Sequence, residues 1–150
     1  MVSAISVGNT ILKKAFAEDI DITPMKLQKL TYMVYKEYLK RTGMPLFNER
    51  FEVWKYGPVL RSIYDAFKYR KANAIKSYAA DSKGGIYIVN EDSSIQFRQA
   101  LECVWNKYKN YDGLVLSQMT HKDGTAWYNA AISKNPFLTD KDIRSEEDFV

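Results

Sequence analysis

The side chains best suited to covalent chemistry in this 150-residue chain are its one histidine, His121, and its one cysteine, Cys103. A nucleophilic site would need His121 as its general base. Asp123 follows His121 by two residues in a glycine-containing segment, and the chain carries neither a Gly-x-Ser-x-Gly motif nor another nucleophile signature. We therefore predict that the protein is not an enzyme and has no catalytic residues.

The sequence also lacks the residue patterns typical of metal binding, phosphate binding and catalysis by paired carboxylates. Nitrogen and sulfur ligands of the kind that hold zinc are nearly absent, so we expect no metal site. Gly84-Gly85 is not followed by the Lys-Ser/Thr pair of a phosphate-binding loop. The adjacent carboxylates Glu146 and Glu147 are interpreted as part of a solvated chain end. We expect no cofactor.

The length of the chain suits one compact domain with a substantial core. We predict a single domain over 1–150, with its core at about 7–132 and a C-terminal extension at 133–150. No apolar run is long enough to cross a bilayer, and the N-terminal residues lack the layout of a signal peptide. One cysteine suits a reducing compartment. These features predict a cytoplasmic protein without a membrane partner.

The elements that must position any site are organised around residues 23–70. Thr23 is a good N-cap, Pro24 suits a first helical turn and Gly43 suits a helix end, which predicts a helix over 24–42. At about 100° per residue, the sequence of this helix separates into two arcs. The apolar arc contains Leu27, Leu30, Thr31, Val34, Tyr35 and Tyr38; the opposite arc contains Lys26, Lys29, Lys36 and Lys40. We predict one buried face and one solvated basic face.

The connector from Gly43 to Pro58 carries too many aromatic residues for a simple linker. Phe51–Trp54 alternates weakly, so either it pairs as a short strand or it simply lays its aromatic side chains on the core. Pro58 is well placed to start the next helix. Ile86–Val89 is the clearest strand candidate, because it is β-branched and aromatic and is bounded by turn-forming residues.

Periodicity and capping signals predict the remaining helices. They begin near Ala4, at Pro58, after Ser93 or Ser94, at Leu114 and after Thr125, with a short last piece after Thr139. The predicted fold class is mainly α: a compact single-domain helical bundle of about five to six helices, with a small β-hairpin or short two- to three-stranded element.

The net charge of +4 is unevenly distributed, since residues 23–78 carry twelve basic and four acidic side chains. Attraction of an acidic partner or of nucleic acid is one interpretation; a lysine-rich helix face in water is the other, which we favour. A helix-turn-helix is disfavoured, because about fifteen residues separate the two helices where that motif has three or four. Tyrosines beside lysines favour a protein interface over stacking on single-stranded nucleic acid.

Four strings of residues carry a more specific signal. They are Met25-Lys-Leu-Gln-Lys-Leu-Thr-Tyr32, Gly43-Met-Pro-Leu-Phe47, Glu52-Val-Trp-Lys-Tyr-Gly-Pro-Val59 and Leu116-Ser-Gln-Met-Thr-His-Lys-Asp-Gly-Thr-Ala-Trp127. In order and spacing they resemble the Panacea domain, the SocA-like and phage GepA-like antitoxin family. The resemblance covers about residues 7–132.

The resemblance implies an antitoxin of a toxin–antitoxin system that neutralises a cognate protein toxin by direct contact, in a phage, prophage or bacterial setting. A proteolytic adaptor that delivers its client to a protease is the alternative, and a basic nucleic-acid-binding regulator is a further one that is less favoured. Oligomeric state is left open. The expected partner-binding residues are Lys29, Tyr32, Lys36, Trp54, Tyr56, His121 and Trp127. For these motif residues, a role in stabilising the fold and a role in toxin contact both remain open.

Overall fold

The computed structural model describes residues 2–150, and the fold is mainly α with a small β-hairpin, as predicted. Within that range there are seven α-helices, where five to six were expected. The elements are α1 (Ala4–Glu18), α2 (Pro24–Thr42), β1 (Glu52–Trp54), β2 (Gly57–Val59), α3 (Arg61–Phe67), η1 (Lys68–Arg70), η2 (Glu91–Ser93), α4 (Ile95–Tyr108), α5 (Gly113–Thr120), α6 (Ala126–Ile132) and α7 (Asp140–Ser145). No helix within residues 2–150 combines the length and the apolar character needed to cross a bilayer.

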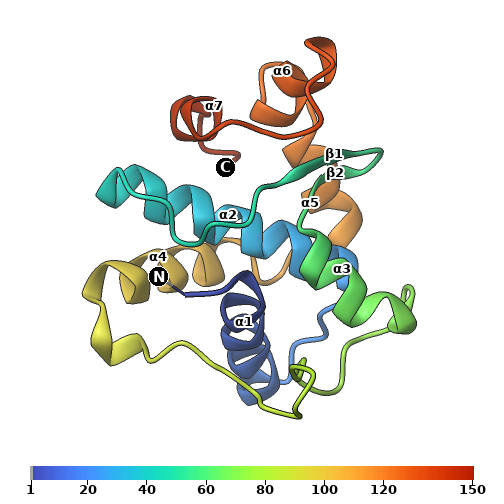
Figure 1. The fold of residues 1–150 in the computed structure, drawn as a ribbon, viewed down its shortest axis with the longest axis vertical. Helices are drawn as coiled ribbons and strands as arrows, with labels where there is room; N and C mark the ends of the chain where they lie inside the picture. The colour runs from blue at the N-terminus through green and yellow to red at the C-terminus, as the bar shows by residue number, and fades with distance from the viewer. Residues whose placement is uncertain (1) are drawn as a thin grey trace.

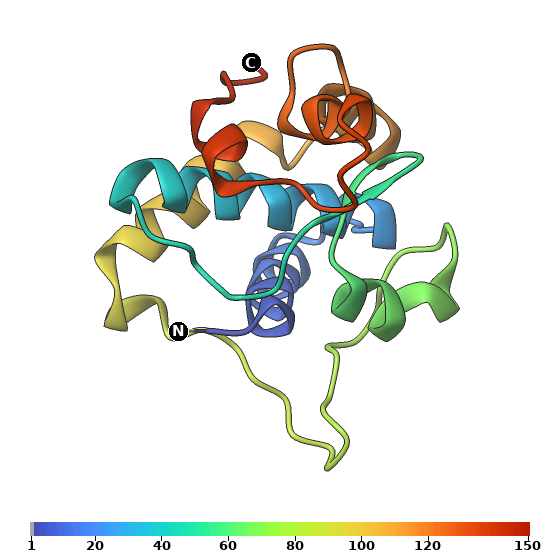
Figure 2. The ribbon, with the colours of Figure 1, turned by 45° about the horizontal axis from the view of Figure 1, so that its top comes forward.

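Helix α2 is the axis of the fold. It runs through the middle of the molecule, with α1, α4, α5, the hairpin, α3 and α7 arranged around it (Figures 1 and 2). Twelve of its 19 residues are buried, so its polar side chains lie inside the protein together with its apolar ones. Of the four lysines on the predicted solvated arc, three are buried and Lys40 is half-buried. The predicted solvated basic face is therefore wrong.

Local capping signals set the ends of α2 as predicted. The Thr23 hydroxyl accepts the Lys26 amide at 3.2 Å, Pro24 occupies the first turn, and Gly43 closes the helix in the left-handed region at φ 73°. The same chemistry begins other helices: the side chains of Ser94, Thr125 and Thr139 each accept an amide three residues ahead. Short-range signals of this kind are readable directly from sequence.

The hairpin forms where the sequence allows a short strand at Phe51–Trp54. β1 pairs antiparallel with β2, with Val53 opposite Pro58. Pro58 thus lies inside a strand, and the prediction that it starts a helix is wrong: α3 begins at Arg61. The chain stays extended to Leu60 because the Gln28 side chain bonds both backbone groups of that residue, donating at 3.0 Å and accepting at 2.9 Å.

A C-terminal segment extends this small sheet. The Val53 amide donates to Pro136 at 3.0 Å, and the Leu138 amide donates to Phe51 at 2.9 Å. Leu138 is buried with the core, as is Ile143 of α7. The Tyr35 hydroxyl, on α2, donates to Asp140 at 2.7 Å. Residues beyond 132 are therefore packed against the same core as the helices before them.

The aromatic connector is part of the core, as its composition indicates. Tyr32 and Tyr35 of α2 pack against Phe47 and Phe51, with ring centroids 4.9–5.2 Å apart and tilted or edge-on rings. All four side chains are buried. Aromatic pairs in these orientations add stability beyond that of apolar burial.

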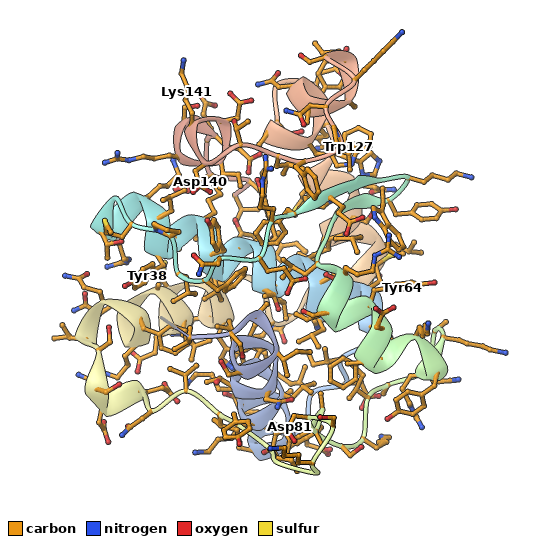
Figure 3. The ribbon with its side chains drawn as sticks, viewed as in Figure 1. Tyr38, Tyr64, Asp81, Trp127, Asp140 and Lys141 are labelled. Atoms are coloured by element: carbon orange, nitrogen blue, oxygen red, sulfur yellow. The ribbon has the colours of Figure 1, made fainter. Side chains whose placement is uncertain are left out.

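Residues 71–90 form a long irregular loop, and the strand predicted at Ile86–Val89 is absent. The backbone of this segment and of Ala79 instead bonds to side chains of α1. The buried Asn9 amide donates to Ala79 at 3.0 Å and to Tyr87 at 3.1 Å, and Thr10 accepts the Val89 amide at 2.9 Å. Side chains of a helix replace the neighbouring strand that a ladder requires. In the view of Figure 3 this loop passes the lower end of α1, where Asp81 lies.

Candidate partner-binding site

The structure divides the seven expected partner-binding residues into two groups. Lys29, Trp54, Tyr56, His121 and Trp127 gather around the β1–β2 hairpin. The remaining two, both on α2, point at a buried carboxylate of the C-terminal segment. The sequence motif thus contributes to two separate clusters, and only the first of them reaches the surface.

Helix α2 supports the hairpin from below. Besides the Gln28 contacts with Leu60, the Lys29 ammonium donates to the Pro58 carbonyl at 2.9 Å. Gly57 is needed at the closest approach: its φ is +116°, and a β-carbon there would lie 2.7 Å from the Thr120 hydroxyl oxygen. Any larger residue would be strained and would clash. The hairpin backbone therefore has one position against α2 and α5.

Helices α5 and α6 hold the other side of the hairpin. The Ser117 hydroxyl donates to the Tyr56 carbonyl, and the Trp127 indole donates to the Trp54 carbonyl at 2.8 Å. Figure 3 shows Trp127 beside the hairpin. His121 ends α5; its Nδ1 contacts the Ser117 carbonyl, and its ring packs edge-on against Trp127 at 5.4 Å. The motif histidine thus braces the turn that follows α5.

Three lysines expected in water are instead buried and bonded to backbone carbonyls. Lys26 donates to Lys109 at the C-terminal end of α4, Lys29 to Pro58 and Lys36 to Glu147. They are 6%, 1% and 5% exposed respectively. A stripe that is bonded to the interior offers no phosphate-binding surface, so the nucleic-acid interpretation of these lysines loses its basis.

Lys29 is the most deeply buried of these cations. Burial lowers its pKa to about 7, and within the described residues no carboxylate lies within ion-pair distance of its ammonium. An unpaired charge in the interior is unfavourable compared with the same charge in water. Lys29 therefore destabilises the folded state most at pH values where it is charged.

Replacing Lys29 with methionine should reduce the pH dependence of stability. Because the folded pKa is about 7 and the ordinary value is 10.5, the unfolded state binds more protons between these pH values. The free energy of unfolding then rises with pH, by up to about 1.4 kcal/mol per unit from this group. Urea denaturation at pH 7 and at pH 9 measures how much the free energy of unfolding increases between these two pH values. In Lys29→Met this increase should be smaller than in the wild type by roughly 2 kcal/mol. Lys40→Met, on the half-exposed part of α2, is the control. If the free energy of unfolding increases equally in the wild type and both variants, the buried charge of Lys29 is not the cause of the pH dependence.

The second cluster surrounds Glu146, which lies in the segment interpreted from sequence as a solvated end. Glu146 is 5% exposed, so that interpretation is wrong for it. Its carboxylate accepts the Tyr32 hydroxyl at 2.9 Å, the Lys36 ammonium at 3.0 Å and the Ala126 amide at the start of α6 at 2.8 Å. Burial and Glu146 together raise the pKa of Tyr32. These contacts tie Tyr32 and Lys36 to the C-terminal segment, and their role in partner binding stays a prediction.

A groove that sequence reasoning missed opens beside the hairpin, between the first turns of α2 and helix α3. It encloses about 490 Å³ and is lined mainly by apolar atoms of Met25, Trp54, Val59, Ile63 and Tyr64. The sequence pattern predicts a helix after Pro58, which contains Ile63 and Tyr64 of this lining, but it predicts no groove. In the described residues, no group of three or more His, Cys, Asp and Glu side chains is placed to hold a metal ion.

Comparison with known proteins identifies the family. The profile of the family described as "Antitoxin SocA-like, Panacea domain" matches residues 27–128, from α2 to α6. The chain belongs to this antitoxin family, and membership indicates a role in a toxin–antitoxin system, with a toxin as the partner. One relative is the protein named Antitoxin SocA from Caulobacter vibrioides (strain NA1000 / CB15N). It is 34% identical over 132 residues, covering 84% of this chain and 69% of the relative. No solved structure matches.

Proposed function

We propose that this protein is an antitoxin that neutralises a cognate protein toxin by binding it directly, with the outer side of the β1–β2 hairpin in the contact surface. The antitoxin role is supported by the family. Direct binding is supported chiefly by the hairpin, because its backbone is bonded to α2, α5 and α6 while Tyr56 at its tip is 51% exposed. Sequestration of a toxin requires a complementary surface and no reaction.

The chemistry of the hairpin tip suits an interface. Tyrosine combines a large apolar ring with a polar hydroxyl, and it is enriched among the residues that dominate binding energy. Lys55, next to Tyr56, is also exposed and holds its ammonium 5.4 Å from the tyrosine ring centroid. A rigid backbone lowers the entropy lost on association. The tip therefore presents a pre-organised aromatic and cationic contact.

Co-expression with the product of the adjacent reading frame tests the proposal. We expect that product alone to arrest growth, and this chain to restore growth and to co-purify with it. Growth that stays arrested would contradict an antitoxin role for this pair. If growth is restored only while a host protease removes the product, delivery for degradation replaces direct neutralisation.

The contribution of the hairpin tip can be measured with two matched variants. Tyr56→Ala should weaken toxin binding at least about tenfold, as expected for an aromatic interface residue. Tyr87→Ala, which removes a tyrosine that is 62% exposed in the loop of residues 71–90, should leave affinity unchanged. Isothermal titration calorimetry gives both values. Equal affinities for the two variants would exclude the tip from the interface.

A further inference from the structure

The groove between α2 and α3 combines an apolar floor with a basic rim. Lys55, Lys68 and Lys71 stand around it with exposed side chains, and its lining contains no aspartate or glutamate. Asp65 pairs with Lys68 at 3.6 Å, and both of these side chains are more than half exposed. Exposed pairs of this kind are weak and exchange readily. Glu52, which is not part of the lining, is paired with Arg61 at 3.1 Å. The rim thus presents a net positive field over an apolar surface.

A buried cation lies beneath the same groove. Lys29 contributes to its lining, yet the only bond of its ammonium in the described structure is to the Pro58 carbonyl. An ammonium group has three donors, so its capacity for a carboxylate is unused. A negative charge brought into the groove would lie in a low-dielectric region, where its attraction to Lys29 is stronger than in water.

The walls of the groove are fixed before any partner arrives. The Trp54 indole donates to Glu52 at 3.1 Å, the Arg61 guanidinium lies over its ring at 4.8 Å, and Tyr64 packs against it at 4.7 Å. Arg61 also pairs with Glu52 at 3.1 Å. Both aromatic walls are therefore oriented by contacts within the chain, which favours binding of a short segment without reorganisation.

We infer that this groove binds a segment of the cognate toxin in which apolar side chains are flanked by aspartate or glutamate. The inference rests on the proposed function and specifies which toxin chemistry the antitoxin recognises. The apolar side chains would fill the space between Met25, Ile63 and Tyr64, and the carboxylates would face the lysine rim. Tryptophan and tyrosine at the walls are typical of interface positions that dominate affinity. Rim charges steer the encounter, so association should weaken as salt increases.

The test compares two triple charge reversals in binding to the purified toxin. Lys55→Glu, Lys68→Glu and Lys71→Glu together should weaken binding at least about a hundredfold at physiological salt, because three attractive contacts become repulsive. Lys83→Glu, Lys122→Glu and Lys141→Glu make the same change in charge at exposed positions elsewhere, and should change affinity by less than about threefold. Circular dichroism verifies that both variants are folded.

The outcomes separate this inference from the proposed function. If the wild type neutralises the toxin and both triple variants bind equally, the groove is not the recognition site while direct neutralisation stands. If the wild type does not bind the toxin, the proposed function fails, and the groove is tested without a toxin. For this, a displayed library of random 16-residue peptides is selected for binding to the wild type. Peptides that also bind the variant with Lys55, Lys68 and Lys71 reversed are then removed. Enrichment of apolar residues flanked by Asp or Glu supports the inference; recovered peptides without acidic enrichment overturn it.

Discussion

Replacing Glu146 with glutamine is expected to lower the free energy of unfolding by about 3 kcal/mol, because the buried Lys36 ammonium loses the charge that compensates it. The neutral amide keeps the size of the side chain, so the effect reports charge and hydrogen bonding with little change in packing. The wild-type carboxylate also accepts the Tyr32 hydroxyl and the Ala126 amide, and one amide oxygen serves them less well.

Urea denaturation followed by far-ultraviolet circular dichroism gives this value. Glu147→Gln is the matched control, since Glu147 is the exposed neighbour and its side chain forms no ion pair in the described structure. We expect the control to lie within about 0.5 kcal/mol of wild type. If the two variants unfold at the same urea concentration, the Glu146 cluster does not stabilise the protein.

Truncation after Asn135 is expected to abolish the cooperative native state. It removes Leu138, Ile143 and Glu146, all of which are buried. Each apolar side chain contributes about 1.5–3 kcal/mol on burial, and loss of the Glu146 ion pair adds about 3 kcal/mol, while a whole domain is stable by only about 5–15 kcal/mol. The shortened chain would also expose the aromatic cluster of Tyr32, Tyr35 and Phe51. The C-terminal segment, beyond the family match at residue 128, would thus be indispensable to the fold.

Thermal unfolding followed by near-ultraviolet circular dichroism tests this expectation. The chain that ends at Asn135 should show no cooperative transition, whereas removal of Val150 alone, which is 53% exposed, should leave the melting temperature unchanged. A cooperative transition in the shorter chain within a few degrees of wild type would mean that residues up to 135 fold without the C-terminal segment.

Local chemistry explains why so much of the helical framework was predictable. The N-caps Thr23, Ser94, Thr125 and Thr139 bond amides three residues away, and Gly43 ends α2 by its own backbone conformation. Such interactions are complete within one turn of chain. The family motifs named Trp54, Tyr56, His121 and Trp127 as expected partner-binding residues without indicating how they are arranged, and the structure places these four around one hairpin. Their role in partner binding stays a prediction.

The failures concern partners far away in the chain. The lysines of α2 form a hydrophilic arc in sequence, but their acceptors are carbonyls of Lys109, Pro58 and Glu147, and any residue type supplies a carbonyl. Ile86–Val89 has the composition of a strand, yet Asn9 of α1 replaces its partner through side-chain bonds. A sequence pattern indicates the conformation and the solvent exposure that a residue favours. It does not indicate which distant group in the chain forms its hydrogen bond.

The most direct test of neutralisation by contact is a titration of purified toxin activity with the purified antitoxin, in the absence of any protease. We predict that activity falls in proportion to the antitoxin added and is lost at a sharp, stoichiometric endpoint, because a tight complex leaves little free toxin. Tyr56→Ala should need a clear excess to reach the same inhibition. Undiminished toxin activity at a tenfold excess of folded wild-type antitoxin would contradict direct neutralisation.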